Sequence, residues 1–136
     1  MINAHKTDLG ASKQGYAMTN GYSFKIVGFC VGNGGHNPLN GNPISVDRSV
    51  TTLPNLIYTS HRIEVGLIDS KTIEVKCTLM DGECVGASIS NLGILASVDN
   101  DSEFLYAVSN FAMVDRGSGD LTFVLNLQNW GIIIWA

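Results

Sequence analysis

A short apolar run in this sequence breaks into a glycine-rich loop, a pattern in which proteins often hold phosphate groups. The run is Lys25-Ile-Val-Gly-Phe-Cys-Val-Gly-Asn-Gly-Gly35. A P-loop would continue with Lys and Ser or Thr, whereas His36, Asn37 and Pro38 follow here. A dinucleotide-binding loop would open a helix at its last glycine, and Pro38 and Pro43 oppose that helix. The sequence therefore predicts no nucleotide cofactor, and instead a strand that enters a long irregular loop.

Asn33, Gly34 and Gly35 give this loop its conformational freedom. These residue types adopt positive φ readily, and their successive backbone amides can form an anion-binding nest. The alternative, which we favour, is a turn that lets the chain pass close to another strand or another chain. Under that interpretation Gly35→Val damages folding or assembly, with no catalytic activity to lose.

No histidine or cysteine has the spacing of a metal site or a redox motif. These residues are His5, His36 and His61, and Cys30, Cys77 and Cys84. Cys77 lies on the apolar side of an alternating run and is expected to be a buried thiol, and His5 to lie in a frayed N-terminus. The acids Asp99, Asp101 and Glu103 resemble the opening of a calcium loop but lack its glycine and distal glutamate. A solvated turn is favoured there, and no metal is expected.

The sequence contains no nucleophile motif of a hydrolase. Most of its twelve acidic residues lie in or beside loop signals, which is the distribution that solvation predicts. Paired carboxylates of a glycoside hydrolase meet in space and not in sequence, so a small hydrolase stays the lowest-ranked alternative. We expect a protein that is not an enzyme.

The composition indicates a surface that is partly covered by other protein. Of 136 residues, 45% are apolar and only 15% charged, against about a quarter charged in ordinary soluble domains. The net charge of −4 argues against nucleic acid as a partner, because the sequence has no basic excess to neutralise phosphates. The alternative is an all-β surface on which Gly, Ser, Thr and Asn replace charges.

The hydrophobic pattern predicts one mainly β domain over residues 1–136. A helix is expected over about 7–21, capped by Thr7 or Asp8 and ended by Asn20-Gly21, with a partial apolar stripe. The stripe consists of Leu9, Tyr16 and Ala17. Strands follow from about residue 22, with alternation typical of hairpins and a last long strand. Those segments are 63–67 with 72–79, 94–96 with 104–108, and 121–128. We expect these strands to pack as an antiparallel β-sandwich-like domain.

Two further segments favour an interaction role. Residues 39–56 form a Gly-, Asn- and Pro-rich loop that is long for an ordinary connection. Trp130-Gly-Ile-Ile-Ile-Trp-Ala136 is apolar but far too short to span a bilayer, so no membrane association is expected. This tail is either a final core strand or a segment that joins a neighbour, and the two can coexist. The predicted assembly residues are Asn33, Gly34, Gly35, Leu53, Leu56, Tyr58, Trp130, Ile132, Ile133, Ile134 and Trp135.

The order of these motifs resembles the phage tail-collar fibre protein family, the attachment domain at the start of many tail fibres. The similar stretches are Thr7-Asp-Leu-Gly-Ala-Ser-Lys13 with Asn20-Gly21, Phe24 to Gly35, Leu53-Pro-Asn-Leu-Ile-Tyr58, Asp81 to Ile89 with Leu92-Gly-Ile-Leu95, and Phe104-Leu-Tyr-Ala-Val108. Asn33 and Asn91 stand near positions where the family commonly has acids. The sequence stops at Ala136 without a fibre shaft, so attachment or assembly is the part of the function that transfers.

The resemblance implies a virion structural protein, a baseplate or tail-fibre attachment subunit. It implies a homo-oligomer, a trimer, with other tail proteins as partners and no catalytic residues. The N-terminus lacks the apolar core of a signal peptide, so the protein is expected to be made in the host cytoplasm and packaged into the virion. The alternative is a carbohydrate-binding β-sandwich for host-surface recognition. Its sugar-stacking side chains would be Tyr58, Tyr106, Trp130 and Trp135.

Overall fold

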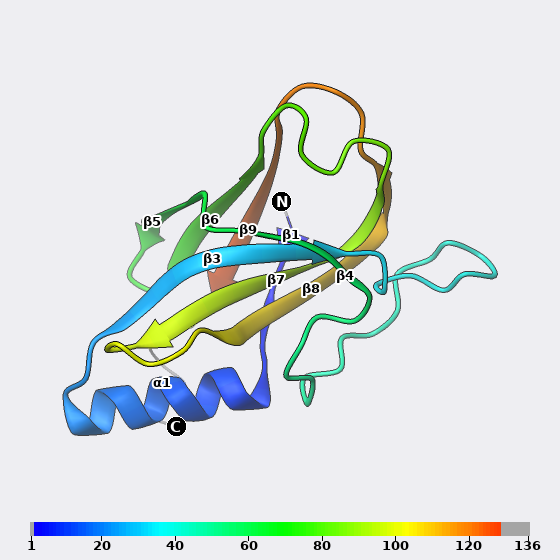
Figure 1. Ribbon diagram of the computed structural model, residues 1–136. Coiled ribbons are helices and arrows are strands. Elements are labelled where there is room, and N and C mark those ends of the chain that lie inside the picture. Colours follow the sequence, from blue (N-terminus) through cyan, green and yellow to red (C-terminus); the bar gives the residue numbers. More distant parts are fainter. Residues whose placement is uncertain (1, 129–136) are drawn as a thin grey trace.

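Two β-sheets pack face to face in a computed structural model that describes residues 2–128, and one helix lies at an end of the sandwich (Figure 1). In chain order the elements are β1 (Ile2–Asn3), β2 (His5–Lys6), α1 (Asp8–Asn20), β3 (Phe24–Gly32), β4 (Leu56–Ser60), β5 (Ile63–Asp69), β6 (Thr72–Leu79), β7 (Ser88–Val98), β8 (Phe104–Asp115) and β9 (Leu121–Gln128). One sheet has the order β1-β9-β6-β5 and the other β2-β8-β7-β3-β4. All pairs are antiparallel except β1 with β9. The mainly β sandwich predicted from the sequence is confirmed.

The predicted hairpins and the predicted last strand are all present. β5 pairs with β6 in a register that places Val65 opposite Val75, and β7 pairs with β8 across the turn at 99–103. β9 pairs with β6 along its whole length, from Leu121 opposite Leu79 to Gln128 opposite Thr72. Alternation was informative for β6 and β9, which bury alternate residues, whereas β7 and β8 bury runs of consecutive residues.

The shared core fills the space between the sheets. β6 contributes Val75, Cys77 and Leu79, all fully buried, and β9 contributes Leu125. From the other sheet come residues such as Phe29. The prediction that Cys77 is a buried thiol is confirmed.

Helix α1 begins and ends as its sequence predicts. The Thr7 side chain accepts a hydrogen bond from the Gly10 amide at 2.8 Å, and Gly21 ends the helix with a left-handed φ of 71°. The predicted apolar stripe is wrong in part, because Tyr16 is 53% exposed. The face that packs on the sheet carries Gly10, Gln14 and Ala17. Small and polar residues occupy it because the helix lies very close to β8.

Three strands were not predicted from the sequence. β1 and β2 each contain only two residues, and β4 contains five. His5 pairs with Val108 in β2, so the expectation of a frayed N-terminus is wrong. Strands this short carry too few residues for an alternating pattern, and their partners are remote in sequence.

Candidate functional site

The glycines after β3 allow the chain to pass close to two other segments. A Cβ atom on Gly35 would lie 2.0 Å from the Ser90 carbonyl oxygen, and one on Gly34 would lie 2.7 Å from that of Pro54. Neither glycine has positive φ, and nor does Asn33, so this crossing does not use the left-handed backbone that these residue types allow. The favoured interpretation, a close crossing of another strand, is confirmed because Ser90 belongs to β7.

Hydrogen bonds fix this crossing from both sides. The Gly35 amide donates to Ser90 Oγ at 2.9 Å, and the Asn33 amide donates to the Asn55 carbonyl at 3.2 Å. The Asn91 side-chain amide donates to the Pro54 carbonyl at 2.9 Å. Two of the amides that an anion nest would use are therefore already engaged within the chain.

Beyond the crossing, residues 36–43 form a projecting turn that is built from its own hydrogen bonds. Asn37 donates through its amide to the Asn42 carbonyl at 2.8 Å and accepts at its own carbonyl from Gly41 at 2.7 Å. A β-bridge joins His36 to Pro43 at its base. Leu39 lies in this turn with 93% of its surface exposed. We call residues 36–43 the projecting turn; it extends away from both sheets (Figure 1).

The other predicted assembly residues have different surroundings. Leu56 is 53% exposed at the start of the edge strand β4, and Asn33 is exposed as well. Leu53 is buried beside Cys30 and Leu105 in a second core cluster, so its assignment to an interface surface is wrong. It anchors the long loop instead. The predicted residues Trp130, Ile132, Ile133, Ile134 and Trp135 lie outside the described residues.

A cluster of titratable groups surrounds Glu83. Its carboxylate accepts from the Tyr58 hydroxyl, from Arg62 at 2.9 Å and from the Met80 amide at 2.7 Å. The Tyr58 hydrogen bond and then the Met80 amide lower the pKa of Glu83, and the same bond to Glu83 raises the pKa of Tyr58. A carboxylate held ionised by several donors is a poor general acid, so this cluster fits a structural role.

Arg116 holds the turn at residues 81–86, which contains Glu83. The sequence reasoning missed this role. Arg116 is only 4% exposed, and its guanidinium donates to the carbonyls of Glu83 at 2.9 Å and Met80 at 2.7 Å. Its backbone amide also donates to Ala87. Nothing in the flanking sequence distinguishes this arginine from a solvated one, because its acceptors lie about thirty residues away in the chain.

The described thiols have the properties of core side chains. Burial raises the pKa of Cys30 and of Cys77 to about 12, and burial likewise raises the pKa of Cys84. A thiol with so high a pKa is protonated near neutrality and is a weak nucleophile. Within residues 2–128, no group of His, Cys, Asp and Glu side chains is arranged to hold a metal ion.

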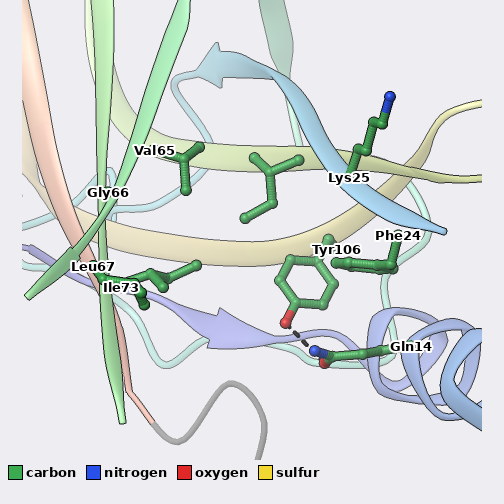
Figure 2. A pocket seen from close by; sticks show the side chains of 9 residues that line it. Gln14, Phe24, Lys25, Val65, Gly66, Leu67, Ile73 and Tyr106 are labelled. Carbon is green, nitrogen blue, oxygen red and sulfur yellow. Dashed lines mark hydrogen bonds between the residues drawn. The ribbon is translucent and has the colours of Figure 1, made fainter. Parts of the chain in front are cut away.

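A cleft opens between the two sheets at the end of the sandwich where α1 lies. Its volume is about 440 Å³, and it was not anticipated from the sequence. Figure 2 shows Val65 and Leu67 of β5 on one side and Phe24 and Tyr106 on the other. The Tyr106 hydroxyl donates to the Gln14 side chain at 2.8 Å. The cleft is lined by Gln14, Phe24, Lys25, Ile26, Val65, Gly66, Leu67, Ile73 and Tyr106.

This position of Tyr106 bears on the carbohydrate-binding alternative, in which its ring would stack on a sugar. The residue is 1% exposed and stacks edge-on against Phe24, with ring centroids 5.0 Å apart. A sugar ring cannot reach its face without displacing the core. Tyr58 is half-buried, and its hydroxyl is engaged by Glu83.

Comparison with known proteins identifies no relative. The sequence matches no family model, and no curated protein or solved structure gives a significant match. Among the described residues, no helix is long and apolar enough to cross a membrane.

Proposed function

We propose that this protein is a structural subunit of a tailed phage or phage-like particle, a baseplate or tail-fibre attachment component that acts through protein–protein assembly. Its partners would be further copies of this chain, as a trimer, and other tail proteins of the virion. The phage assignment rests only on the resemblance of the ordered sequence motifs to those of tail-collar fibre proteins. The assembly role is supported by one feature of the structure above all, the projecting turn with Leu39 exposed on it.

The projecting turn is suited to docking because it is ordered before it binds. Besides its backbone bonds, the Asn37 and Asn40 side chains accept from the amides of Leu39 at 2.9 Å and Asn42 at 3.0 Å. An ordered loop loses little conformational entropy on association. Burying an exposed leucine in a partner's pocket contributes about 1.5–3 kcal/mol. The arrangement therefore supplies an anchor at low entropic cost.

The edge strand β4 offers a second contact surface. It lies at the outside of the five-stranded sheet, and its Leu56 and Ile57 are 53% and 40% exposed. A free strand edge with apolar side chains is a template for strand addition by a neighbour. This strand begins directly after Asn55, whose carbonyl holds the crossing loop, so it lies next to the base of that loop.

The test is the mass of the full chain in solution over a range of concentrations, by analytical ultracentrifugation. We expect a trimer whose dissociation constant rises about tenfold to a hundredfold in Leu39→Asp, since each factor of ten corresponds to about 1.4 kcal/mol. Val85→Asp is the matched control, because Val85 is also an exposed apolar residue in a turn, at 55% exposure. A monomer at every concentration, or equal weakening by both variants, would contradict the proposal.

A further inference from the structure

The cleft between the sheets is a mostly apolar site, and the side chains that line it do not fill it. Phe24, Ile26, Val65, Leu67 and Ile73 supply most of its wall. At about 440 Å³ it falls in the range of roughly 300–1,000 Å³ in which proteins hold small ligands or side chains. The Tyr106 hydroxyl inside it already donates to Gln14, and Lys25 is the charged residue among those that line the cleft.

One side of the cleft exposes large apolar side chains on strand β5. Leu67 is 71% exposed and Val65 47%, although both face the space between the sheets (Figure 2). Apolar surface of this kind gains about 25 cal/mol for each Å² removed from water. The energetics therefore favour an apolar occupant, and its chemistry should be aliphatic or aromatic.

The end of β9 lies beside this cleft. Leu127 is paired with Ile73, which lines the cleft, and Gln128 is paired with Thr72. The last described residue, Gln128, thus lies one residue beyond the partner of Ile73, a wall of the cleft. The sequence then continues with Asn129-Trp-Gly-Ile-Ile-Ile-Trp-Ala136, which carries no charged side chain.

This segment has the reach and the turn residues needed to enter the cleft. Eight residues extend at most about 26 Å, which is ample for a site adjacent to their starting point. Asn129 and Gly131 are residue types that accept the backbone angles of a tight turn. A short tether also gives the segment an effective concentration in the millimolar range at the cleft.

We propose that the apolar segment Trp130–Trp135 folds back on its own chain and occupies the cleft between β3 and β5. Docked there, it would cover Val65 and Leu67, which line the cleft. The docking is intramolecular, so it does not depend on the proposed assembly function and stands or falls separately from it. A second copy's segment and an external apolar ligand are the competing occupants, and tryptophan fluorescence separates them.

Tryptophan fluorescence of the full chain reports on this segment alone. The chain has two tryptophans, Trp130 and Trp135, and both lie within it. We expect blue-shifted emission and low acrylamide quenching that stay constant on dilution. Leu67→Glu places a charge in the cleft and should shift the emission to that of indole in water, with a severalfold rise in quenching. Leu39→Glu, at the exposed leucine of the projecting turn, should change neither.

Each other outcome contradicts the proposal. Emission of the unaltered chain that matches free indole shows an undocked segment and leaves the cleft to an external ligand, and protection that persists in Leu67→Glu shows docking elsewhere. Protection that disappears on dilution together with a fall in mass assigns the cleft to a second copy. If far-UV circular dichroism shows that Leu67→Glu fails to fold, Val65→Glu replaces it, because Val65 lines the same cleft and is 47% exposed.

Discussion

At the scale of single residues, two glycines of α1 have opposite surroundings. A Cβ atom on Gly10 would lie 2.2 Å from the Tyr106 carbonyl oxygen, whereas one on Gly15 meets no atom within 4 Å. Helix propensity alone treats both as defects that alanine would repair by about 1 kcal/mol. Packing reverses the sign at Gly10, because the missing side chain is what lets α1 approach β8.

We therefore expect Gly10→Ala to lower the free energy of unfolding by about 1–3 kcal/mol, the usual cost of overpacking. Gly15→Ala should raise it by about 0.4–1 kcal/mol, because alanine restricts the unfolded chain and fits the helix. Urea denaturation followed by circular dichroism measures both values. Equal effects of the two substitutions would show that α1 does not lie as close to β8 as described.

At the scale of elements, the loop between β3 and β4 is fixed to the sheet at one crossing. Gly35 lies against Ser90 of β7, and the buried Leu53 anchors the far end of the loop. Between these two points the chain forms the projecting turn. The crossing therefore determines where the exposed Leu39 is presented.

Gly35→Val is expected to destabilise the protein by about 1–3 kcal/mol or more, since a Cβ atom 2.0 Å from the Ser90 oxygen forces the backbones apart. Gly117→Val serves as the control, because a Cβ atom there meets nothing within 4 Å and its φ is not positive. Thermal denaturation compares the two. If Gly35→Val melts at the temperature of the control, the close crossing does not exist in solution.

At the scale of the whole molecule, buried titratable groups link stability to pH. Burial, and then the charge of Arg48, lower the pKa of Lys6 to about 8 from its ordinary 10.5. Between these values the unfolded chain binds more protons at this lysine than the folded one, so stability rises with pH. Burial raises the pKa of Cys30 and Cys77 from 9 to about 12, so above pH 9 these thiols make stability fall with pH.

The folded state should therefore gain stability from about pH 8 until the thiols offset the gain above about pH 9. In Lys6→Met the initial rise should disappear, while the decline caused by the thiols remains. Denaturant unfolding at a series of pH values gives the two profiles. Parallel profiles for the unaltered chain and Lys6→Met would show that Lys6 titrates alike in both states.

The sequence by itself determined the features that a few neighbouring residues encode. Thr7 and Gly21 mark the ends of α1 because capping depends on residues within one helical turn. The alternation of Val75, Cys77 and Leu79 indicated which face of β6 is buried, because a strand alternates its side chains every residue. These local rules also gave the hairpins and the mainly β class.

Only the tertiary structure decided what depends on segments far apart in the chain. The buried position of Arg116, the need for Gly10 and the core location of Leu53 each depend on a partner many residues away. The cleft is formed by residues from α1, β3, β5, β6 and β8, so no local sequence pattern predicts it. Periodicity records which face of an element is covered, but it does not record which element covers it or how closely. That information comes from packing, and packing placed both the projecting turn and the cleft.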